Sequence, residues 1–177
     1  LDQEYQDFLN EIEETEFDLF IISCLSKTKK PDEVNEYSKN SEFMINGTKS
    51  TNFIVPLNHI MSSFGKPTKK ETISDDCGVY LSDLFYHYAS LVLSVDEKEK
   101  KAELVEVILT DKNTFIFNSN DILKATTTER DFIKKYGNYL DNNFKAPNNY
   151  WMYLDYGSIT FEFVEGKLYK ITINNYC

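Results

Sequence analysis

The side chains of this sequence that could carry out chemistry are few and widely spaced. There are two histidines, His59 and His87, and three cysteines, Cys24, Cys77 and Cys177. A metal site needs convergent ligands, such as two histidines at i and i+4 or a Cys-x-x-Cys pair, and the sequence has neither. Nucleophilic catalysis needs a serine or cysteine beside a base, and no local motif joins a cysteine to a histidine. We therefore expect no metal and no covalent catalysis.

Acid-base chemistry and phosphate binding have equally weak signals. The adjacent carboxylates of Asp75 and Asp76 could act together, but such pairs are common in surface turns. The six glycines are isolated from one another, so no glycine-rich loop is present to hold a phosphate or a nucleotide. We expect neither a cofactor nor enzymatic activity. A small hydrolase or transferase with a carboxylate dyad stays an alternative, which activity lost in Asp75 or Asp155 variants would support.

Charge limits the class of partner. The net charge is −10, and the first eighteen residues hold eight carboxylates without a lysine or arginine. Arg130 is the sole arginine, so the bidentate phosphate contacts of nucleic-acid binding proteins are scarcely possible. We expect no nucleic acid. An acidic surface would instead attract a basic protein, although solvation alone explains most acidic surfaces.

Composition and length describe a folded chain without a membrane span. With 177 residues, 41% of them hydrophobic and 15% aromatic, the chain can bury a core, and no apolar run reaches the roughly 20 residues of a membrane helix. The odd number of cysteines favours a reducing compartment. The start at Leu1 rather than Met leaves open a removed signal peptide or lipid-attachment segment. The expected location is cytoplasmic, or periplasmic if a signal peptide was removed.

Residues 43–65 and 115–137 align without a gap at an offset of 72. The matches fall on apolar positions at the start of a strand and on an amphipathic helix that ends in an aromatic residue and glycine. Among them are Phe43 with Phe115, Ile60 with Phe132, Met61 with Ile133, Phe64 with Tyr136, and Gly65 with Gly137. The sequence therefore predicts a duplicated module. A duplicated unit without a catalytic motif favours a protein whose function is to present a surface.

Hydrophobic periodicity predicts the elements that position these residues. Residues 2–14 are predicted to form an amphipathic helix with an apolar face and an acidic opposite face. Residues 17–22 extend it or form a strand, and residues 26–42 form a connecting segment. The first module (43–112) has strands at 43–45, 78–81, 88–95 and 104–110, a helix at 57–64 closed by Gly65, and a charged hairpin tip at 96–101.

The second module (113–177) repeats this order. Its elements are a strand at 115–117, a helix that begins at Thr128 and ends at Gly137, and strands at 150–154, 159–163 and 168–173, with Glu165-Gly166 as a turn. Short connections inside the sheet predict an α+β fold with the helices on one face. The pattern does not decide whether the modules share one sheet.

Aromatic residues on two of these strands predict a binding surface. Tyr86-His87-Tyr88 and Tyr150-Trp151-Met152-Tyr153 hold more aromatic rings than one face of a sheet can bury, and alternation directs half of them outward. Tyrosine and tryptophan often anchor protein interfaces. The alternative is that Trp151 and Tyr153 are core while Tyr150 flanks a loop. The expected partner contacts are Asp75, Asp76, Tyr86, Tyr88, Trp151, Tyr153, Asp155 and Tyr156.

These patterns resemble known families. Phe64-Gly65-Lys66-Pro67 after a helix, followed by hairpins that end in Phe163-Val164-Glu165-Gly166-Lys167-Leu168, is similar to the module of the β-lactamase inhibitor protein and of small outer-membrane assembly lipoproteins. Ile45-Asn46-Gly47 and Asp75-Asp76-Cys77-Gly78-Val79-Tyr80 resemble a bacterial family of immunity proteins that partner secreted toxins. The likeness covers about residues 43–173. Cys77, where an aliphatic residue is expected, and the acidic N-terminal helix depart from it.

The resemblance implies a non-enzymatic inhibitor. Such a protein would bind a cognate toxin with a basic surface and neutralise it by covering the active site. The alternative that the resemblance leaves open is an envelope lipoprotein that acts as an assembly scaffold or chaperone, which a lipid-attachment cysteine just before Leu1 would favour.

Overall fold

The computed structural model describes residues 42–45, 48–50, 53–74, 80–111, 113–117, 121–141, 148–154 and 157–175. The predicted helix at 2–14, the segment at 17–22 and the connecting segment up to residue 41 lie outside these ranges. The predicted strand at 43–45 is present as β1 (Glu42–Ile45), which pairs with β2 (Thr48–Lys49). The pairing is antiparallel, with Met44 opposite Lys49 and Ile45 opposite Thr48.

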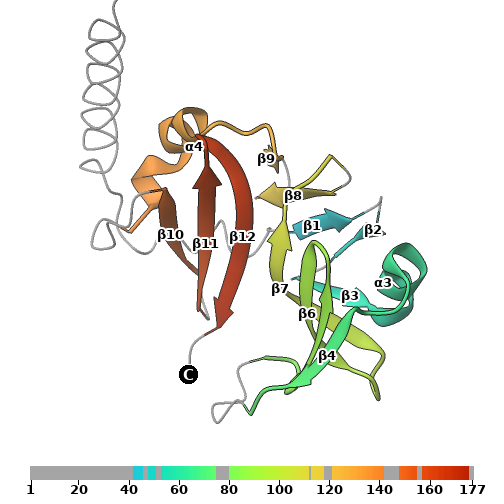
Figure 1. Cartoon of the computed structure of the whole chain (residues 1–177). Helices are drawn as coiled ribbons and strands as arrows, with labels where there is room; N and C mark the ends of the chain where they lie inside the picture. Colours follow the sequence, from blue (N-terminus) through green and yellow to red (C-terminus); the bar gives the residue numbers. More distant parts are fainter. Residues whose placement is uncertain are drawn as a thin grey trace, which may run out of the picture.

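A large antiparallel sheet forms the centre of the protein (Figure 1). Its order is β10 (Asn149–Leu154), β11 (Gly157–Val164), β12 (Lys167–Asn175), β7 (Lys101–Ile108), β6 (Leu91–Asp96), β5 (Leu84–Tyr88) and β4 (Lys69–Thr72), and β3 (Ile54–Pro56) pairs with the first part of β7. A smaller sheet has the order β2, β1, β8 (Asn113–Phe117) and β9 (Asp121–Leu123). Strands from both predicted modules therefore share both sheets, and the α+β class is confirmed.

Two short helices are among the described elements. α3 (Leu57–Phe64) ends at Gly65, whose φ of 73° is a conformation that glycine adopts without strain. α4 (Glu129–Tyr136) begins at Thr128, whose hydroxyl oxygen accepts from the Asp131 N–H at 3.1 Å. α4 ends at Tyr136 with Gly137 as its C-cap, as predicted, and a 3₁₀ turn (Gly137–Tyr139) follows because the φ of Gly137 is −52°. Neither described helix has the length and apolar character needed to cross a membrane.

Both helices cover the same face of the large sheet. One row of direct cross-strand partners runs over six strands of this face, and all its members are buried: Tyr150, Phe161, Ile171, Val107, Leu91 and Tyr88. In α4, the Phe132 ring lies 4.7 Å from that of Phe161, and in α3 the Phe64 ring lies 5.6 Å from that of Tyr88. Phe115 of β8 joins the same buried cluster, so the small sheet covers this face as well.

The two halves meet along a short seam between β7 and β12. The pairs at this seam are Lys170 with Ile108, Ile171 with Val107, and Thr172 with Glu106. Away from the seam, each helix start is tied to a hairpin turn in the same way. The Leu57 N–H donates to the Lys100 carbonyl, and the Glu129 N–H donates to the Gly166 carbonyl, both at 2.9 Å.

Some strands differ from the sequence prediction. Tyr80 and Leu81 are not in a strand, and the predicted strand at 88–95 is a hairpin in which β5 ends and β6 begins around Ala89-Ser90. That turn has no glycine, asparagine or proline to mark it. β4, whose sequence is Lys-Lys-Glu-Thr, was not predicted because an edge strand without apolar residues has no periodic signal. The charged hairpin tip after Asp96 is confirmed.

Candidate functional site

The face of the large sheet opposite the helices, here called the open face, also has a continuous row of cross-strand partners. Seven residues are direct cross-strand partners in sequence across the sheet: Trp151, Thr160, Thr172, Glu106, Val92, His87 and Lys69. Direct partners project on the same side of a sheet. Because this row lies one residue from the buried row, it points away from the core, and none of its members is fully buried.

A charged cluster occupies the centre of the open face. Lys170 Nζ lies 2.9 Å from Glu162 Oε2 and 3.7 Å from Glu106 Oε2, and the three side chains are 28%, 31% and 31% exposed. The hydrogen bond to Glu162 raises the pKa of Lys170. Two carboxylates share one ammonium group, so the cluster holds a net negative charge at neutral pH.

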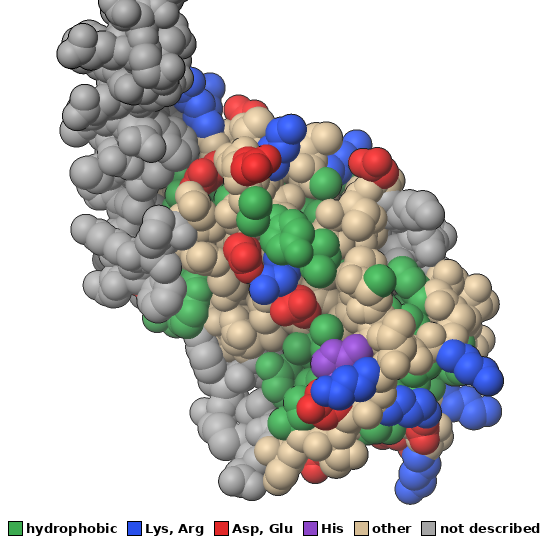
Figure 2. Space-filling model, viewed as in Figure 1, with side chains coloured by type: hydrophobic (Ala, Val, Ile, Leu, Met, Phe, Trp, Pro, Cys, Tyr) green, Lys and Arg blue, Asp and Glu red, His purple; other side chains and the backbone are tan. Residues whose placement is uncertain are grey.

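Polar side chains of β11 and β12 lie on the same half of the face. Asn174 Nδ2 donates to Thr160 Oγ1 at 3.0 Å and reaches Ser158 Oγ at 3.4 Å. On the side of the molecule shown in Figure 2, acidic and basic side chains lie next to one another, without a broad patch of one sign. The surface is therefore suited to specific polar contacts rather than to long-range attraction of a strongly charged polymer.

Two of the predicted contact residues lie at the β10 end of the open face. Trp151 is partly buried, and Tyr153, two residues along the same strand, is 50% exposed. The Tyr153 hydroxyl donates to Asp141 Oδ2 at 2.9 Å, which orients the ring. Tyr150, at 9% exposure, is core, so the alternative that it flanks a loop while its neighbours are buried is wrong.

Tyr86 and Tyr88, which were predicted to contact a partner, lie in the core instead. They are 2% and 8% exposed and belong to the core, so they are not outward-facing contact residues. His87, between them, lies on the other side of the sheet and is partly exposed. Phe85 lies on that side as well, but it is buried with its ring against that of Tyr80. The sequence showed alternation, but it could not show which of the two alternating sets packs against the helices. The other predicted contacts, Asp75, Asp76, Asp155 and Tyr156, lie outside the described residues.

A cluster of polar groups at the β4 edge includes the buried Tyr86. Its hydroxyl donates to Glu97, and Lys70 Nζ lies 2.8 Å from Glu97 Oε1 and 2.5 Å from Tyr86 Oη. Hydrogen bonds from Lys70 and Tyr86 lower the pKa of Glu97, and hydrogen bonds to Glu97 and Tyr86 raise that of Lys70. Burial is the main cause of the raised pKa of Tyr86.

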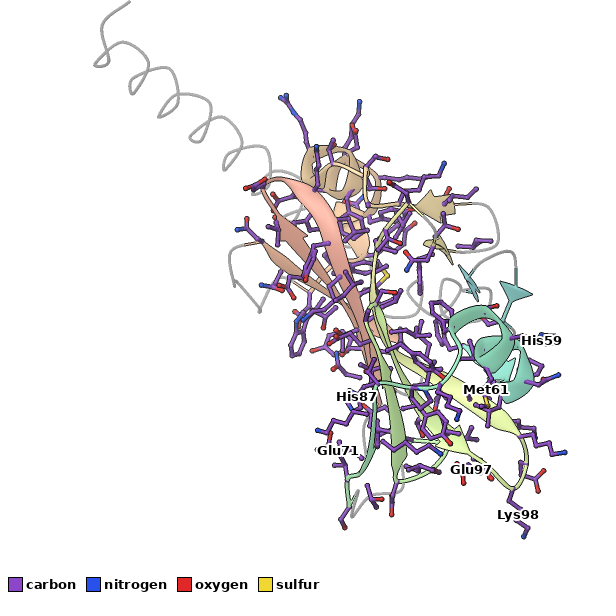
Figure 3. All side chains as sticks on the ribbon, turned by 45° about the vertical axis from the view of Figure 1, so that its right-hand side comes forward. His59, Met61, Glu71, His87, Glu97 and Lys98 are labelled. Carbon is purple, nitrogen blue, oxygen red and sulfur yellow. The ribbon has the colours of Figure 1, made fainter. Side chains whose placement is uncertain are left out.

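His87 forms a second ionic cluster on the open side of the same edge, where Figure 3 shows it on the strand beside that of Glu71. Glu71 Oε2 lies 2.7 Å from Lys69 Nζ and 3.2 Å from His87 Nε2. The approach to His87 is not aligned for a hydrogen bond, but a protonated imidazole would form an ion pair there. The Lys69 hydrogen bond is the main cause of the lowered pKa of Glu71.

The charged cluster of Glu106, Glu162 and Lys170 depends on the pairing of β7 with β12, two strands that are far apart in the sequence. No local motif could therefore have identified the whole cluster. The alternation of Thr160 and Glu162 with buried Ile159, Phe161 and Phe163 does indicate a polar face. The described residues include no group of three histidine, cysteine or acidic side chains placed to hold a metal ion.

Comparisons of the chain with models of protein families, with curated proteins and with solved structures found no match.

Proposed function

We propose that this chain is a non-enzymatic immunity protein that binds a cognate bacterial toxin and neutralises it by covering the active site. The observation that carries the proposal is the open face itself. It crosses seven strands, and both described helices pack on the opposite side. A broad sheet face with aromatic residues at one end is a surface that a second protein can cover.

The chemistry of the open face favours a partner with a basic group. Trp151 and Tyr153 offer large rigid side chains whose burial costs little conformational entropy. On the same face, Glu106 and Glu162 share Lys170, which leaves one carboxylate charge for an incoming lysine or arginine. An aromatic anchor beside a partly desolvated acid would bind a loop that carries a basic residue.

We also propose that residues 43–112 and 113–177 are copies of one module. Two structural relations support this duplication. α3 and α4 begin 72 residues apart, and Phe43 and Phe115, which match at the same offset, are direct antiparallel partners. When equivalent residues of two copies face each other in antiparallel strands, a local two-fold axis passes between them. Such an axis would join two small surfaces into the one open face.

Capture of the toxin and binding measurements test the proposal. A tagged full-length chain purified from its native cells should recover a stoichiometric protein that is toxic when expressed alone and harmless when coexpressed. With that protein as the ligand, Trp151→Ala and Tyr153→Ala should each raise Kd by about tenfold or more in calorimetry. Met61→Ala is the matched control, since Met61 is 42% exposed on α3, on the other side of the sheet.

Two results would count against the proposal. Folded Trp151→Ala and Tyr153→Ala variants that bind with unchanged Kd would show that the open face is not the contact surface. Recovery of envelope assembly factors, or of no stoichiometric partner, would favour the scaffold or chaperone alternative.

A further inference from the structure

The two outer strands of the large sheet differ in how they are protected. At β10, the Trp151 carbonyl accepts from the Asp141 N–H at 2.8 Å, so the segment after α4 occupies part of that edge. At the opposite end, β4 pairs with β5, and no described strand pairs with its outer edge. An edge of this kind is a template for another strand.

Backbone alternation shows which groups of β4 face outward. The Ile73 N–H donates to the Asp83 carbonyl at 2.9 Å, toward β5. The Leu84 N–H, which lies opposite Thr72, donates to Ser82 Oγ at 3.0 Å instead of to β4. The N–H and C=O groups of Thr72 and Lys70 are therefore directed away from β5 and are available to a neighbouring strand.

Lysines on an edge strand ordinarily prevent such pairing. Here Lys69 and Lys70 are each paired with a carboxylate of the same chain. Lys69 Nζ is 2.7 Å from Glu71, and Lys70 Nζ is 2.8 Å from Glu97 and 4.3 Å from the centre of the Tyr86 ring. The edge therefore has a small net charge, and Lys70 is drawn back over its own sheet.

We propose that β4 pairs with β4 of a second copy of this chain, in antiparallel register about a two-fold axis at Lys70. This register places Lys69 of each copy opposite Glu71 of the other, which is a favourable cross-strand pair. At the axis the two Lys70 residues face each other, and each is paired with Glu97 of its own chain. Lys69 and Glu71 lie on the same side as His87, so the open faces of the two copies form one continuous surface.

Strands this short give a small interface, so the association is weak. We expect a reversible monomer–dimer equilibrium with a dissociation constant between about 10 µM and about 1 mM. Sedimentation equilibrium of the full-length chain over that range measures it. A reductant is present throughout, because disulfides between the chain's three cysteines would imitate a dimer.

Charge exchange at the two paired positions tests the register. Glu71→Lys alone and Lys69→Glu alone should each weaken self-association by about tenfold, because two attractive pairs become repulsive. The double variant Lys69→Glu/Glu71→Lys should restore it. A mixture of the two single variants should form a heterodimer that is tighter than either homodimer, which no change confined to one chain would produce.

A backbone variant tests the edge without altering charge. Thr72→Pro removes an outward N–H and should abolish the dimer, whereas Thr72→Ala should leave it intact. A chain that stays monomeric up to about 1 mM would overturn the proposal. So would a dimer whose dissociation constant does not change in the folded charge variants. Binding of a toxin is a separate measurement, so either proposal can fail without the other.

Discussion

Glu106 of β7 and Thr172 of β12 are direct antiparallel partners at the centre of the large sheet. The seam on which they lie has three residue pairs, and the Lys170 ammonium group crosses it to reach Glu106. On the same open face, Lys170 also holds Glu162 of β11. The charged cluster therefore joins strands of both halves across a seam of three residue pairs.

Loss of the Lys170 ammonium group should weaken the fold modestly. Lys170→Met leaves two neighbouring, partly buried carboxylates without their shared cation, and we expect a loss of about 1 kcal/mol in the free energy of unfolding at pH 7. Urea denaturation measures it. Lys167→Met, on an exposed residue at the start of the same strand, should change the free energy by less than about 0.5 kcal/mol.

The raised pKa of Lys170 gives this prediction a pH dependence. A raised folded pKa means that the stabilisation is fully present below the unfolded pKa of about 10.4 and is lost as the pH rises through the folded value. The difference between wild type and Lys170→Met should therefore be constant from about pH 7 to 9 and shrink above about pH 10.5. A difference that grows in alkali would contradict the ion pair.

Gly65 should be the turn residue least tolerant of substitution at the end of α3. With φ 73° and ψ −146°, it occupies a region that side chains other than glycine rarely adopt, although a β-carbon there would meet no atom within 4 Å. Gly65→Ala should lower the free energy of unfolding by about 1–3 kcal/mol from backbone strain alone. Lys66→Ala, at the next residue, should have little effect. Equal stability of both variants in urea would show that the turn relaxes freely.

Local sequence signals predicted where the helices begin and end better than they predicted which side chains are exposed on the sheet. Gly65 and Thr128 mark the ends of α3 and α4 through their own backbone and hydrogen-bonding chemistry, so a few residues suffice to predict them. Which side of β5 is buried depends on the elements that pack against the strand. The prediction that Tyr86 and Tyr88 face outward was therefore wrong. Lys170 meets Glu162 within one hairpin, but it meets Glu106 only through the pairing of β7 with β12, which is non-local.

Acid should remove the stabilisation that Glu97 gives through its hydrogen bonds to Lys70 and Tyr86 at the β4 edge. The lowered pKa of Glu97, caused mainly by Lys70, means that its contribution is present above the unfolded pKa of about 4.3 and is lost as the pH falls through the lower folded value. Glu97→Gln should therefore reduce the fall in melting temperature between about pH 5 and pH 3. Glu99→Gln, on the same hairpin turn, is the control. If both variants melt like wild type across this range, the cluster does not contribute to stability.

The two buried tyrosines of β5 should respond in opposite ways to removal of their hydroxyl groups. Tyr86 donates to Glu97 and accepts from Lys70, so Tyr86→Phe should lower the free energy of unfolding by about 1–3 kcal/mol. The Tyr88 hydroxyl is buried, and it has no hydrogen-bond partner among the described residues. Tyr88→Phe removes an unsatisfied polar group and should be neutral or stabilising.

Urea denaturation of both variants at pH 7 makes this comparison, with unchanged m-values as the check that each unfolds in the same way. The two rings lie two residues apart on one strand and share the same core, so the loss of a hydroxyl changes packing little in either case. The difference between the variants therefore measures the hydrogen bonds of Tyr86. A Tyr88→Phe variant that loses as much stability as Tyr86→Phe would mean that the Tyr88 hydroxyl is bonded in solution.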